Sequence, residues 1–179
     1  MGRYDSNGLA WRYELPLDLQ GIFSINLLEF IAAAITIYMT TIHQKECILA
    51  FTDSSSALGW LYKAYFSNSQ KAHNRVAQLL EKLLMKKESS LYSQHIKGTH
   101  NFITDSLSRD HHMSINQLTF AFYILVPQQT PQNLTISTIL PEIISWLYSI
   151  RPLLTNQQAS PQRQSRSKLD ALTAGKDSL

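Results

Sequence analysis

The stretch CILAFTDSSSALGWL, residues 47–61, contains the strand-to-helix unit on which the predicted fold rests. Its first part, Cys47–Thr52, is a continuous apolar run, which predicts a central β-strand that is covered on both faces. Asp53 ends this strand, and the serines that follow, Ser54, Ser55 and Ser56, are good starters for a helix that continues through Tyr65. The unit therefore predicts a buried strand that ends in an acidic side chain.

Strand-like and helix-like patterns alternate on both sides of this unit. Before it, turn-forming residues at 5–8 lead into a strand at 9–15, a short paired strand at 22–23 and a helix at about 27–42. After it, a polar break at 67–70 precedes a second amphipathic helix, a strand at 91–96 and a short helix at 102–109. This order is typical of an α/β layer fold, in which helices flank a mixed sheet.

The C-terminal part of the chain differs in composition from the part before it. Residues 1–112 are predicted to form the principal domain. Residues 113–154 contain two apolar segments, 117–126 and 140–150, and are predicted to form a helical extension. Residues 155–179 are polar, rich in Gln, Ser and Arg, and lack an apolar period, so this tail is expected to be disordered.

The composition is that of an intracellular globular protein. The 179 residues are 44% hydrophobic, which is enough to bury one sizeable core. The longest apolar stretch, residues 25–42, is interrupted by polar side chains and falls short of a membrane span. No basic stretch followed by an apolar run opens the chain, and the single cysteine, Cys47, excludes a disulfide framework. We therefore expect a cytoplasmic or nuclear location and no membrane partner.

Three acidic residues, Glu29, Asp53 and Asp105, are the candidate catalytic residues. Each has a structural alternative, because Glu29 could complete a capping box with Asn26, Asp53 could cap a helix, and Asp105 could be a solvated surface charge. Their joint placement favours function. Ends of strands and starts of facing helices meet at one edge of an α/β sheet, so the three carboxylates are expected to converge there.

Clustered carboxylates repel one another unless a cation lies among them. Oxygen ligands at fixed positions suit Mg²⁺, which prefers to share its coordination shell with substrate phosphate. Two such ions can activate a water molecule and stabilise the leaving oxygen of a phosphodiester. We therefore expect Glu29, Asp53 and Asp105 to be metal ligands as well as catalytic residues.

Three motifs carry a resemblance to a known family: INLLEFIAA around Glu29, FTDSSSALGWL around Asp53 and HIKGTHNFITDSLSRD around Asp105. They resemble the ribonuclease H domain of retroelement reverse transcriptases, of the Ty3/gypsy-like or DIRS-like kind. The resemblance implies a hydrolase that cleaves the RNA strand of an RNA–DNA hybrid with two Mg²⁺ ions, as an endonuclease joined to a polymerase domain in the parent polyprotein. The third motif is the most specific, and its matching residues are His95, Ile96, Gly98, Asn101, Asp105, Leu107, Ser108 and Arg109.

The sequence departs from this family at its start. Ribonuclease H domains open with a strand that carries a fourth acidic ligand, and no good candidate for it precedes Trp11. Asp5 belongs to the sequence DSNG, which is typical of a hairpin turn. We therefore expect a ribonuclease H-like fold without its first strand, truncated at the N-terminus and weak or inactive. A noncatalytic, connection-like module that binds nucleic acid and a decayed element fragment are the alternatives, so whether the chain is an enzyme stays open.

Other residues are candidates for substrate binding. Asn101 could orient the substrate or cap the last helix of the motif, His100 could assist product release, and Ser54 adjoins the acidic strand end. His95, His111 and His112 compete with His100 for that role. Basic residues that could contact the phosphates of a hybrid are Lys63, Lys71, Arg75 and Lys97.

Overall fold

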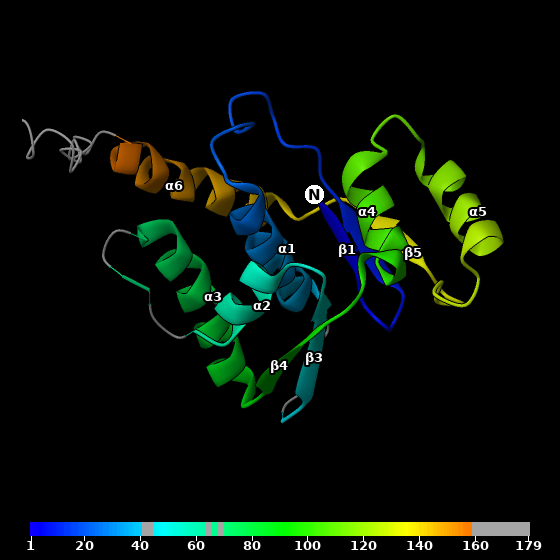
Figure 1. The fold of residues 1–179 in the computed structure, drawn as a ribbon, viewed down its shortest axis with the longest axis horizontal. Helices are drawn as coiled ribbons and strands as arrows, with labels where there is room; N and C mark the ends of the chain where they lie inside the picture. Colours follow the sequence, from blue (N-terminus) through cyan, green and yellow to red (C-terminus); the bar gives the residue numbers. More distant parts are fainter. Residues whose placement is uncertain (41–44, 64–65, 68–69, 159–179) are drawn as a thin grey trace, which may run out of the picture.

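The computed structural model describes residues 1–40, 45–63, 66–67 and 70–158 (Figure 1). Its strands are β1 (Gly2–Tyr4), β2 (Leu9–Arg12), β3 (Cys47–Thr52), β4 (Ser90–His95) and β5 (Thr135–Ser137). Its helices are α1 (Ile25–Met39), α2 (Ser55–Leu61), α3 (Lys71–Lys87), α4 (Phe102–Arg109), α5 (Ile115–Leu125) and α6 (Pro141–Gln158), with a 3₁₀ turn η1 at Gly98–His100. The mixture of helices and strands confirms the α/β class.

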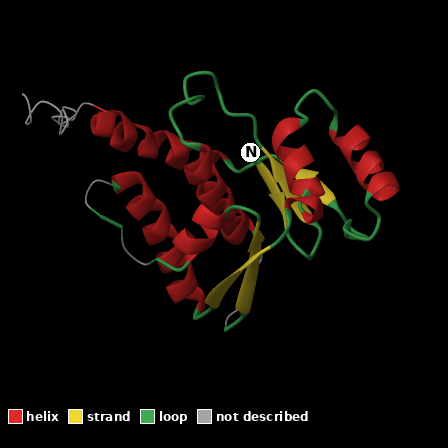
Figure 2. Ribbon diagram, viewed as in Figure 1, coloured by secondary structure: helices red, strands yellow, loops and turns green. Residues whose placement is uncertain are grey.

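The strands of the described residues form two sheets rather than one (Figure 2). The first has the order β1-β2-β5, in which β1 is antiparallel and β5 parallel to β2. The second consists of β3 and β4, which are parallel. The prediction that the strand before the turn at residues 5–8 is missing is wrong, because β1 precedes this turn and pairs with β2. A mixed sheet is thus present, but it does not continue from β1 into β3.

The entry into α1 differs from the sequence prediction. Residues 22–23 lie in a turn, so the predicted short strand there is wrong. The cap of α1 is Ser24, whose Oγ accepts a hydrogen bond of 3.3 Å from the Leu27 amide. The predicted capping box of Asn26 and Glu29 is therefore wrong, since a serine two residues earlier satisfies the free amides of the first turn. This leaves the Glu29 carboxylate free of any capping role.

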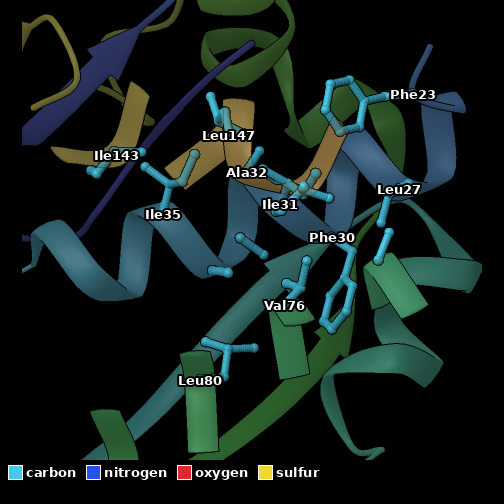
Figure 3. Packing of buried hydrophobic residues seen from close by; sticks show 14 of the residues in the cluster. Phe23, Leu27, Phe30, Ile31, Ala32, Ile35, Val76, Leu80, Ile143 and Leu147 are labelled. Atoms are coloured by element: carbon cyan, nitrogen blue, oxygen red, sulfur yellow. The ribbon is translucent and has the colours of Figure 1, made fainter. Parts of the chain in front are cut away.

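The larger hydrophobic core lies around α1, between the sheets and helices α3 and α6. Figure 3 shows Ile35 of α1 beside Ile143 and Leu147 of α6, and Phe30 of α1 beside Val76 of α3. Burial of each large apolar side chain contributes about 1.5 to 3 kcal/mol to stability. The helix is therefore held rigidly along its length, and Glu29 with it.

A smaller core lies on the opposite side of β2, under α4 and α5. Successive side chains of β2 point to opposite faces, so Ala10 packs in the smaller core and Trp11 in the larger one. Ile103 and Leu107 of α4 pack into the smaller core. The helix that carries Asp105 is thereby anchored against the first sheet.

The strand β3 has the predicted bounds but lacks the predicted burial. Its side chains alternate, with Cys47, Leu49 and Phe51 exposed. The prediction of a strand covered on both faces is wrong, because the helices of the larger core cover one face only. The helix that follows β3 is as predicted at its start, where Ser54 caps it through a hydrogen bond of 3.2 Å from the Ala57 amide.

The predicted extension, residues 113–154, contributes to both cores. It supplies β5 to the first sheet and α6 to the packing around α1. Helix α6 continues to Gln158, past the expected start of the tail, and residues 159–179 lie outside the described ranges. None of the helices in the described ranges is both long and apolar enough to cross a membrane.

Candidate functional site

Glu29 and Arg3 form a close ion pair where α1 meets the first sheet. Nη2 of Arg3 donates a hydrogen bond of 2.6 Å to Oε2 of Glu29. The Arg3 side chain is only 7% exposed, whereas that of Glu29 is 31% exposed, so the carboxylate reaches water and the guanidinium does not. This pair was not foreseen from the sequence.

Arg3 also connects the two sheets. Its Nη1 donates a hydrogen bond of 3.3 Å to the carbonyl oxygen of Phe51, on β3, and its Nη2 donates one of 3.4 Å to the carbonyl oxygen of Glu29. A single guanidinium from β1 therefore contacts the end of β3 and the second turn of α1. Since β1 and β3 share no strand pairing, these bonds are part of what holds the two sheets together at the site.

Asp53 follows the end of β3 that this guanidinium contacts, two residues after Phe51. Burial lowers the pKa of Arg3, and the negative charges of Glu29 and Asp53 act against this shift. Asp53 also adjoins the η1 turn, because a Cβ placed on Gly98 would lie 3.6 Å from Oδ2 of Asp53. The alternative role of Asp53 as a helix cap is wrong, since Ser54 caps α2. Glu29 thus contacts Arg3 directly, and Asp53 is near enough for its charge to act on the same guanidinium.

Asp105 meets Glu29 at a different place, a cleft of about 310 Å³ at the N-terminal end of β1. Both acids line it together with Arg109 and His111. Asp105 lies 3.8 Å from the guanidinium of Arg109, one turn further along α4, and both side chains are substantially exposed. A pair of this kind stabilises little, so Asp105 remains available to a ligand.

His111 closes one side of this cleft in its neutral form. Burial, together with the positive charges of the N-terminus and Arg12, lowers the pKa of His111. Nη2 of Arg12 lies 3.3 Å from Nδ1 of His111, and since a guanidinium can only donate, this nitrogen accepts. Only a neutral imidazole can accept this hydrogen bond.

The predicted substrate-binding residues are spread along the segment between β3 and α4. His100 is exposed in η1, whereas Asn101 is buried and begins α4 without a side-chain capping bond. Ser54 is engaged as the cap of α2. Asn101 therefore does not have the capping role that was its alternative, and His100 has the freedom that substrate contact would need.

In the described part of the chain, the three acids are not grouped around one metal position. Glu29 contacts Arg3 and also lines the cleft, Asp105 lines the cleft, and Asp53 is not among the residues that line it. Within the described part of the chain, no three His, Cys, Asp or Glu side chains are grouped so that they could hold a metal ion. The Arg3 guanidinium contacts Glu29, and its positive charge acts on Glu29 and Asp53, which is the role that a cation has among clustered carboxylates.

Arg3 is the site residue that sequence reasoning missed. The turn at Asp5–Gly8 implies a strand on each side, so residues 2–4 could have been paired with 10–12 from the pattern alone. This pairing places Arg3 opposite Trp11. A signal was therefore present, although nothing local indicates that the arginine is buried.

Comparison with models of known protein families, with curated proteins and with solved structures found no match to this chain.

Proposed function

We propose that this chain is a ribonuclease H-like domain of a retroelement reverse transcriptase, which holds an RNA–DNA hybrid and cleaves it weakly or not at all. The proposal rests on the motif around Asp105, whose residues lie on a strand, a tight turn and a helix in the order that the family resemblance implies. The contact between Arg3 and Glu29 favours the noncatalytic form, because it commits a catalytic acid to an internal cation.

Basic side chains on α3 support contact with a polyanion. Lys71 and Arg75 are exposed and border a hollow of about 480 Å³ between α3 and α6. Lys97 is exposed at the start of the η1 turn, near Asp53. A protein that recognises a hybrid by its shape uses such groups against the phosphates, and each contact adds to the salt dependence of binding. The proposed partners are therefore a hybrid duplex and the polymerase domain of the same polyprotein.

The test is binding and Mg²⁺-dependent cleavage of a labelled RNA–DNA hybrid by the purified chain. We expect binding without appreciable cleavage, and the same result for Asp53→Asn. Cleavage that Asp53→Asn abolishes would show that the chain is a working nuclease. Failure to bind the hybrid in low salt, by a folded protein, would refute the proposal altogether.

A matched pair of variants locates the binding surface. Lys71→Gln with Arg75→Gln removes two positive charges at the start of α3, and Lys82→Gln with Lys86→Gln removes two exposed charges further along the same helix. We expect only the first pair to weaken hybrid binding and to reduce the slope of log K against log salt, by about one for each lost contact. Equal effects from both pairs would mean that net charge alone attracts the duplex.

A further inference from the structure

Arg3 lies on a strand that other parts of the protein contact on two sides. The pairing of β1 with β2 places it opposite Trp11, and helix α4 lies so close to Gly2 that a Cβ there would be 2.6 Å from Cβ of Leu107. The strand that carries Arg3 is therefore fixed between α4 and β2. Its guanidinium lies on the face of the strand that packs on α1, and its side chain is only 7% exposed.

The acids around Arg3 would otherwise lack a counter-charge. Glu29 contacts the guanidinium directly, and Asp53 is close enough for its charge to act on it. Two neighbouring carboxylates that are only partly exposed repel each other, and a nearby cation offsets this repulsion. We propose that the guanidinium of Arg3 is the resident cation of this acidic site, and that its presence keeps a divalent metal ion from binding between Glu29 and Asp53.

Geometry and charge both support this inference. A Mg²⁺ ion needs oxygen ligands at about 2.0 to 2.1 Å in a nearly octahedral arrangement. Oε2 of Glu29 is already the acceptor of the Nη2 hydrogen bond, and the same Nη2 also contacts the Glu29 carbonyl oxygen. A metal ion at this position would have to displace a buried positive group or lie against it, and like charges at such a distance repel.

This inference goes beyond the proposed function, because it concerns the cation of the site and not the nucleic acid. A chain that binds no hybrid would refute the proposed function and leave the role of Arg3 untouched. The test therefore uses the free protein without nucleic acid, and Mn²⁺ as a paramagnetic probe of divalent-ion binding.

Four proteins are titrated with Mn²⁺ and followed by electron paramagnetic resonance of the free ion: the natural chain, Arg3→Gln, Arg3→Lys and Arg151→Gln. The last removes one positive charge from the exposed ion pair with Asp18 and so controls for net charge. We expect Arg3→Gln to bind Mn²⁺ at least about tenfold more tightly than the other three, since only it removes the cation from the site. Adding Glu29→Gln or Asp53→Asn to Arg3→Gln should abolish the gain.

Two results would overturn the inference. One is Mn²⁺ binding by the natural chain that is lost on Asp53→Asn, and the other is a folded Arg3→Gln protein that gains no binding. If circular dichroism shows that Arg3→Gln is unfolded, the inference is tested by Mn²⁺ binding to the natural chain alone. Nε of Arg3 is buried in the described part of the chain, and its N–H resonance should stay unchanged on addition of Mg²⁺. A Mg²⁺-induced shift or loss of that resonance would contradict the inference.

Discussion

The indole N–H of Trp11 donates a hydrogen bond of 3.0 Å to Oγ1 of Thr36, joining β2 to α1 in the larger core. Trp11 is completely buried and lies directly opposite Arg3 in the hairpin. Side chains that oppose each other in antiparallel strands point to the same face, so Trp11 and Arg3 both face α1. The hydrogen bond between Trp11 and Thr36 therefore positions the hairpin against α1 so that Arg3 contacts Glu29.

Replacing Thr36 by Val should destabilise the protein, because it leaves the buried indole N–H without an acceptor. We expect the free energy of unfolding, measured by urea denaturation, to fall by about 1 to 2 kcal/mol. Thr135→Val in β5 is the control, since Thr135 is exposed, and should change stability by less than about 0.5 kcal/mol. Equal losses from the two variants would mean that the Trp11 hydrogen bond contributes nothing specific.

Removing the partner of a buried charge should cost more than removing the charge itself. Glu29→Gln leaves the enclosed Arg3 guanidinium poorly compensated, and we expect a loss of about 2 kcal/mol, below the usual range for a fully buried pair because Glu29 is partly exposed. Arg3→Gln should cost less, since Glu29 can turn to water. Urea denaturation of both single variants and the double variant gives the coupling energy, and strictly additive losses would contradict the ion pair.

Gly2 is needed where α4 crosses β1. A Cβ at this position would lie 2.6 Å from Cβ of Leu107 and 2.7 Å from its backbone carbonyl carbon, so Gly2→Ala must push the helix and strand apart. We expect a loss of about 1 to 3 kcal/mol in urea denaturation, as for other overpacked sites. Gly59→Ala is the matched control, because a Cβ there meets nothing within 4 Å and α2 should gain about 0.5 to 1 kcal/mol. A harmless Gly2→Ala would show that α4 moves freely over the hairpin.

His73 should make stability depend on pH. Its ring packs edge-on against Trp60 at a centroid distance of 4.6 Å, and burial lowers the pKa of His73 below its usual value of 6.5. The unfolded chain therefore binds the proton more readily, and the free energy of unfolding should fall as the pH drops below about 6.5. Above about pH 6.5, neutral His73 makes its full contribution to the free energy of unfolding.

Thermal melting between about pH 7.5 and pH 5.5 tests this dependence, with His73→Phe compared against His112→Gln. Phenylalanine preserves the ring contact with Trp60 and cannot take up a proton, so its melting temperature should fall less on acidification. His112 is exposed, and its replacement should leave the pH dependence as it is in the natural chain. Identical pH profiles for the natural chain and His73→Phe would contradict the assignment.

Local signals predicted local structure well in this chain. The serine that caps α2, the bounds of β3 and the span of α4 follow from residues next to one another in sequence, and all were predicted. The failures depend on partners distant in sequence. Exposure of one face of β3 depends on where the helices pack, and the cap of α1 required a choice between two polar residues two positions apart, Ser24 and Asn26.

The sequence by itself determined where the acids stand: Asp53 at the end of a strand, Glu29 early in an apolar helix and Asp105 on the helix of its motif. Capping preferences and apolar periods act over a few residues, so they can be recognised without the fold. Only the tertiary structure decided what Glu29 and Asp53 face. Burial of Arg3 arises when the hairpin packs its Arg3 and Trp11 side chains against α1, and the contact between Arg3 and Glu29 is therefore a property of packing between segments far apart in the chain.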